Sequence, residues 1–65
     1  MDRSQIIKRL KLITENIGQL KHALGRAEID DNLELIDHLQ AEIRKLHEEA
    51  EELRKNFRES PQRTH

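Results

Sequence analysis

The stretch GRAEIDDN, from Gly25 to Asn32, lies between two long series of regularly spaced leucine and isoleucine residues. It decides the fold, because the chain either turns here or continues as one helix. Both series alternate spacings of three and four residues, which is typical of a narrow coiled-coil seam. However, Leu24 and Ile29 would both occupy heptad position a although they are five residues apart. Neither a three- nor a four-residue insertion absorbs that offset, so the sequence predicts a turn between them.

Each half of the chain carries one apolar seam, and the two seams match when one is reversed against the other. In an antiparallel hairpin the residue numbers of facing pairs have a constant sum, and pairs such as Ile6 with Ala50 sum to 56. Arg9 and Glu49 then flank the seam as an attractive pair. We therefore expect an all-α antiparallel helical hairpin folded about Glu28. The seam residues are Ile6, Leu10, Ile13, Ile17, Leu20, Leu24 and Ala27 in the first half, and Ile29, Ile36, Leu39, Ile43, Leu46, Ala50, Leu53 and Phe57 in the second.

Capping signals set the expected helix boundaries. Gly25 suits the left-handed conformation that closes a helix. Asp30 or Asp31 suits the N-cap of the second helix, where Glu34 completes a capping box, and Asp2 suits the N-cap of the first. We expect a hairpin over residues 1–58, with a helix at 3–25, a turn at 26–29 and a helix at 30–58. Because Ser60 and Pro61 end the second helix, residues 59–65 are expected to form a disordered tail.

The composition excludes several classes of protein. The 65 residues are 38% charged and include one phenylalanine, no tyrosine or tryptophan, and no cysteine. The lack of cysteine excludes a disulfide scaffold and cysteine-based catalysis, and it suits a reducing compartment. No apolar run exceeds two residues, which excludes a signal peptide and a membrane span. We expect a cytoplasmic protein.

A lone pair of helices leaves one side of every seam residue in water, so we expect two hairpins to associate into an antiparallel four-helix bundle. Four large apolar residues lie off the seam: Ile7 and Leu12 near the start of the first helix, and Leu33 and Leu35 near the start of the second. Within one hairpin the two pairs lie at opposite ends. In a homodimer with its turns at opposite ends, Ile7 and Leu12 of one copy come level with Leu33 and Leu35 of the other. This predicts an interface that includes Leu12 and Leu35. The alternative is a monomer completed by the helices of a different protein.

Charge is divided unevenly along the chain. Residues 1–27 carry six basic and two acidic side chains, net +4, whereas residues 28–65 carry six and eleven, net −5. This asymmetry favours packing of the two helices against each other. In an alternative interpretation, Lys8, Lys11, Lys21 and Arg26 form a basic face that binds nucleic-acid phosphates. The chain lacks the stacking aromatic residues typical of single-strand binders.

The sequence contains no pattern typical of a metal site or an active site. His22, His38 and His47 are not spaced four residues apart, and no His-Glu-x-x-His motif is present. No nucleophile-base pattern or glycine-rich phosphate loop is present either, so we expect no cofactor, no metal and no enzymatic activity. Gly18 lies mid-helix, either tolerated on an exposed face or placed there for close approach by another helix.

Two resemblances bear on function. The stretch LHEEAEEL, residues 46–53, resembles the second helix of the Rop plasmid RNA-binding proteins, which implies an antiparallel four-helix bundle that binds RNA. The stretch LKHALGRAEIDDNLELIDHL, residues 20–39, resembles the helical-hairpin interaction motif of the UvrB and UvrC repair proteins, which implies a protein-docking hairpin. We expect a small regulatory or adaptor protein that self-associates and acts through helix–helix interaction. The alternatives are an RNA-binding bundle and an inhibitor hairpin that docks on a larger enzyme.

Overall fold

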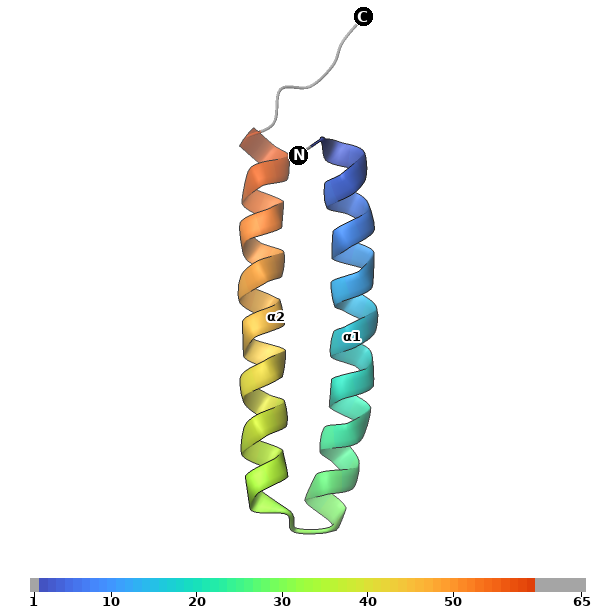
Figure 1. The fold of residues 1–65 in the computed structure, drawn as a ribbon, viewed down its shortest axis with the longest axis vertical. Helices are drawn as coiled ribbons and strands as arrows, with labels where there is room; N and C mark the ends of the chain where they lie inside the picture. The colour runs from blue at the N-terminus through green and yellow to red at the C-terminus, as the bar shows by residue number, and fades with distance from the viewer. Residues whose placement is uncertain (1, 60–65) are drawn as a thin grey trace, which may run out of the picture.

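The chain folds into two antiparallel helices joined by a short turn (Figure 1). The computed structural model describes residues 2–59. Helix α1 spans Arg3–Ile29 and helix α2 spans Leu33–Glu59, and each has 27 residues. The predicted hairpin is therefore confirmed. Of the predicted tail at 59–65, Glu59 belongs to α2 and the remainder lies outside the described residues.

The turn lies further along the chain than predicted, because α1 continues past Gly25. No described glycine has a positive φ, and the left-handed residue is Asp31, with φ 55°. The amide of Asn32 donates a hydrogen bond to the carbonyl oxygen of Ala27 at 3.0 Å and closes the end of α1. Aspartate tolerates the left-handed conformation better than most residues do. The extra turn of α1 also buries Ala27, which is 2% exposed. The predicted boundaries at 25 and 30 and the turn at 26–29 are thus wrong.

The N-cap of α2 is Asn32, rather than Asp30 or Asp31 as predicted. Its Oδ1 accepts a hydrogen bond from the backbone N–H of Leu35 at 3.3 Å. The capping box predicted between Asp31 and Glu34 is therefore wrong, since Asp31 lies outside the helix in the left-handed region. At the other terminus the predicted cap is confirmed, because Oδ1 of Asp2 accepts a hydrogen bond from the amide of Gln5 at 2.9 Å.

Removing the cap should destabilise the hairpin measurably. Asn32→Ala leaves an amide in the first turn of α2 without its side-chain acceptor, so we expect the free energy of unfolding to fall by about 1 kcal/mol. Asn16→Ala is the matched control, because Asn16 is exposed within α1, where alanine favours the helix. Equal melting temperatures for the two variants in circular dichroism would show that Asn32 does not act as a cap.

The later turn changes the register of the hairpin. The main core cluster contains buried Ile6, Ile13, Ala50 and Leu53, with half-buried Leu10, Ile17, Leu46 and Phe57 packed against it. A constant sum of 56 would place Arg3 opposite Leu53, whereas Arg3 contacts Phe57, four residues further along α2. This difference agrees with a turn centred near Asp31 rather than near Glu28.

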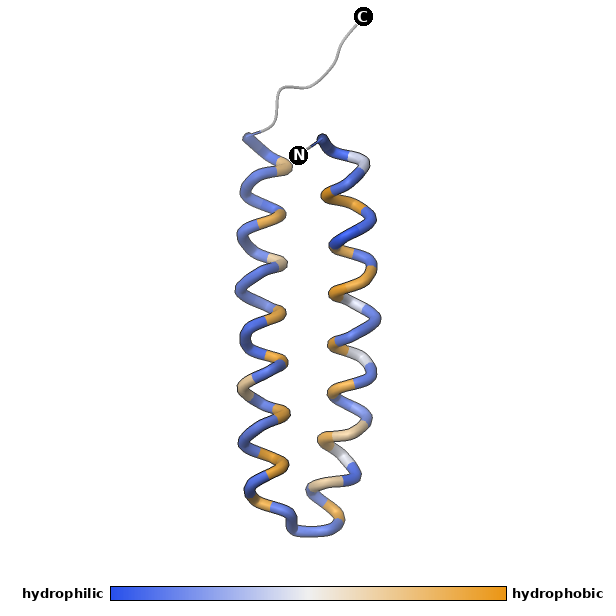
Figure 2. The backbone as a smooth tube through the Cα atoms, in the orientation of Figure 1, coloured by the Kyte–Doolittle hydropathy of each residue, from blue (hydrophilic) through white to orange (hydrophobic). Residues whose placement is uncertain are grey.

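The apolar residues of the two helices face each other along their length (Figure 2). Of the fifteen residues predicted for the two seams, all but Ile29 are buried or half-buried. Ile29 was predicted to begin the second seam, but it ends α1 instead and is 84% exposed. At the free ends of the helices, the guanidinium carbon of Arg3 lies 4.4 Å from the centroid of the Phe57 ring, a cation–π contact between α1 and α2.

Candidate docking surface

The two sides of the seam are covered to different extents. The seam residues at heptad position d are mostly buried: Ile6, Ile13, Ala27, Leu39 and Leu53 lie below a tenth exposed, and Leu20 and Leu46 are half-buried. The residues at heptad position a, which we call the a row, are half-buried with the exception of Ala50. The a row consists of Leu10, Ile17 and Leu24 from α1 and Ile36, Ile43, Ala50 and Phe57 from α2.

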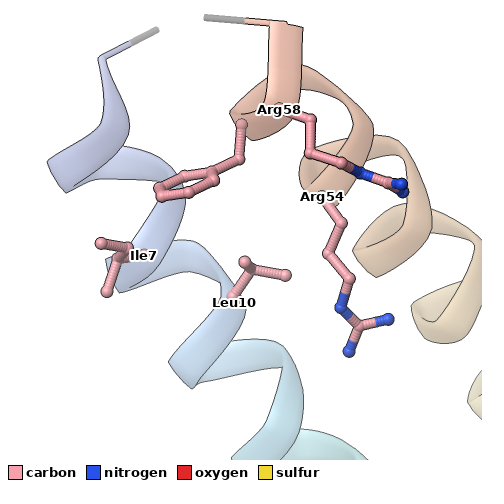
Figure 3. Close-up of a pocket in the computed structure, with 5 residues that line it drawn as sticks. Ile7, Leu10, Arg54 and Arg58 are labelled. Atoms are coloured by element: carbon pink, nitrogen blue, oxygen red, sulfur yellow. The ribbon is translucent and has the colours of Figure 1, made fainter. Parts of the chain in front are cut away.

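The a row lies on one broad face of the hairpin. In an antiparallel pair, positions a and e of both helices turn toward the same side, and positions d and g turn toward the other. We call the first side the open face. Figure 3 shows its hollow near the free ends of the helices, of about 310 Å³, lined by Ile7, Leu10, Arg54, Phe57 and Arg58. A second hollow of about 400 Å³ shares Ile7 and Leu10 and continues along α1 past Thr14. The open face is thus an apolar surface with a charged rim.

The face on the other side, which we call the closed face, carries an ion pair across the seam. Nε of Arg9 donates a hydrogen bond to Oε2 of Glu49 at 2.7 Å, which confirms the predicted pairing of these two residues. This hydrogen bond and the charge of Glu49 raise the pKa of Arg9 above its usual value. Any stability from this shift is present below the unfolded-state pKa and is lost only as pH rises through the higher folded-state pKa, so it is constant near neutral pH.

The off-seam apolar residues are divided between the two faces. Ile7 and Leu33 occupy e positions on the open face and are 43% and 71% exposed. Leu12 and Leu35 occupy c and g positions on the closed face, and they are 51% and 40% exposed. A single flat interface therefore does not include all four, contrary to the arrangement expected from the sequence. The heptad positions group Ile7 with Leu33 and Leu12 with Leu35. From the sequence they were grouped only by the helix in which they lie.

The four basic residues proposed for nucleic-acid contact are all exposed on α1 but do not form one patch. Lys8 and Arg26 are 18 residues apart, or about 27 Å along the axis. They occupy positions f and c, away from the open face, whereas Lys11 and Lys21 occupy positions b and e beside it. The net charge of α1 is thus spread around the helix.

The histidines are likewise separated. His22, His38 and His47 are exposed at three different heptad positions. Among residues 2–59, no group of three histidine, aspartate or glutamate side chains is arranged to hold a metal ion. Neither described helix has the length and apolar character needed to cross a membrane.

Comparison with known protein families, curated proteins and solved structures finds no match to this chain. The resemblances to the Rop proteins and to the UvrB and UvrC hairpin gain no support from these comparisons.

Proposed function

We propose that the chain is a small, cytoplasmic, non-enzymatic adaptor that works by helix–helix docking and that pairs with a second copy of itself to form a four-helix bundle. The half-buried a row is the observation that carries this proposal. Six apolar residues of that row are partly in water although their spacing is that of a core. Burying an apolar side chain fully is worth about 1.5–3 kcal/mol, so covering this row provides the driving force for association.

A second copy fits this face for reasons of length and chemistry. The open face runs along two 27-residue helices, or about 40 Å. Another hairpin of this chain presents an apolar row of the same length and spacing, flanked by charges of both signs. Antiparallel packing of two such hairpins is the usual route by which short helix pairs complete a core. The closed face, with Arg9, Glu49, Leu12 and Leu35, then remains outside the bundle and is available to another protein.

Sedimentation equilibrium of the unmodified chain tests self-association. We expect a mass twice the 7.7 kDa of the chain at micromolar concentration, with dissociation on dilution. A mass of one chain over the same range, with full helicity in circular dichroism, would contradict the proposal. In that case the open face would be covered by a different protein.

A further inference from the structure

We infer that the closed face binds a helix of another protein, with an arginine of that helix inserted beside Glu42. This inference rests on the proposed self-association, because a second copy on the open face leaves the closed face uncovered. It goes further by naming the side chain that the partner brings. Three features support it: a half-buried carboxylate without a charged partner, a hollow of mixed chemistry around it, and an exposed leucine on either side.

Glu42 is half-buried but has no charged partner. Among the described residues, three charged side chains belong to half-buried residues: Arg3, Glu42 and Glu49. Arg3 lies over the ring of Phe57, and Glu49 accepts the hydrogen bond from Arg9. Glu42 forms no ion pair or side-chain hydrogen bond with any residue that the structure describes. Because a carboxylate that has lost part of its water is costly without a partner, a cation placed against Glu42 would be stabilising.

The hollow that contains Glu42 suits the whole of an arginine side chain. Its volume is about 320 Å³, and it lies on the closed face because its lining residues occupy positions c, d and g. Leu20 and Leu46 provide apolar surface, whereas Asn16, Gln19 and Glu42 provide oxygen atoms that accept hydrogen bonds, and no lining residue is basic. An arginine can lay its apolar stem on the leucines and direct its five N–H donors to these oxygens. Its hydrogen bonds to a carboxylate are stronger than those between neutral groups.

The two exposed leucines of the closed face lie on either side of this hollow. Leu12 precedes Gln19 by seven residues on α1, and Leu35 precedes Glu42 by seven residues on α2. Because the helices are antiparallel, these two offsets run in opposite directions, and each is about 10.5 Å along the axis. A helix that carries an arginine, with apolar residues seven positions before and after it, therefore matches the closed face in length and in chemistry.

A synthetic helix tests the inference. The probe is a peptide rich in alanine and glutamine, with a central arginine and a leucine seven residues to either side. When it is added to the ¹⁵N-labelled chain, we expect saturable NMR shifts of the side-chain amide signals of Asn16 and Gln19. Replacing the arginine of the peptide with glutamine should weaken binding at least about tenfold, because hydrogen bonds to a charged group are lost. The absence of saturable binding at concentrations of the arginine peptide up to about 1 mM would overturn the inference.

Two substitutions in the chain give a matched comparison. Glu42→Gln removes the carboxylate but keeps the size of the side chain, so we expect it to weaken binding of the arginine peptide at least about tenfold. Glu48→Gln makes the same change of charge at an exposed f position, and it should leave the affinity nearly unchanged. Equal affinities for the two variants, both helical in circular dichroism, would show that Glu42 does not receive the arginine and would overturn the inference.

Sedimentation of the same samples distinguishes the failure of this inference from the failure of self-association. A dimer that does not bind the arginine peptide would overturn the inference alone. A single chain that binds the peptide through Glu42 would refute the four-helix bundle and would support the closed-face site.

Discussion

Replacing Ile13 with alanine is expected to unfold the isolated chain. Ile13 is 1% exposed and belongs to the main core cluster, together with Ile6, Ala50 and Leu53. Large-to-small substitutions at such sites cost about 2–5 kcal/mol, because the cavity adds to the lost transfer free energy. A domain of this size has only a few kcal/mol of net stability. Circular dichroism at 25 °C should therefore show the loss of most of the helical signal.

Ile29→Ala is the control for this experiment, because it removes the same atoms from an 84% exposed side chain. We expect its free energy of unfolding to stay within about 0.5 kcal/mol of that of the unmodified chain. The comparison also tests the corrected boundary, since Ile29 would lie in the seam if the turn were at 26–29. Comparable destabilisation by the two variants would contradict the observed register.

Placing lysines at both ends of the open face is expected to prevent self-association while leaving the hairpin folded. Ile7 and Leu33 are 43% and 71% exposed within one chain, so Ile7→Lys with Leu33→Lys disturbs little of the hairpin core. In the dimer the double variant would bring four new charges to the edge of an apolar interface, which is costly to desolvate. We expect the dissociation constant to rise at least about 100-fold, or ~2.7 kcal/mol. Sedimentation velocity together with circular dichroism would show a helical monomer.

The matched control is Leu12→Lys with Leu35→Lys, which makes the same change of charge on the closed face. These side chains are 51% and 40% exposed, similar in degree to Ile7. The proposal predicts that this variant still forms dimers. Monomers from the control and dimers from the open-face variant would instead support the interface expected from the sequence, with Leu12 and Leu35 at its centre.

Periodicity predicted the fold because a hairpin is determined mainly by where apolar residues recur. The a and d spacing from Ile6 to Phe57 identified two helices, and the incompatible phases of Leu24 and Ile29 required a turn. The position of that turn was missed because Gly25 was assigned the left-handed conformation that Asp31 adopts. Local capping preferences are weak, and the burial of Ala27 in the extra turn of α1 outweighs them.

The difference between the two faces was not predicted from the sequence. Spacing alone assigns positions a and d equally to the seam, whereas the structure shows that the d positions are mostly buried and the a positions half-buried. Which of the two positions is more buried depends on how each helix is rotated about its own axis, so it requires the three-dimensional arrangement. The e and c positions of Ile7 and Leu12 were readable from the sequence, and they would have placed these two residues on different faces.

The central claim is that a second copy of this chain covers the a row. It is tested most directly by an isotope-filtered nuclear Overhauser experiment on an equal mixture of ¹³C-labelled and unlabelled chains. The account predicts cross-chain signals from methyl groups of the a row, such as those of Ile17 and Ile43, and none from the methyl groups of Ile29. If the methyl groups of the a row showed signals only within their own chain at concentrations where the protein is fully folded, the account would be contradicted.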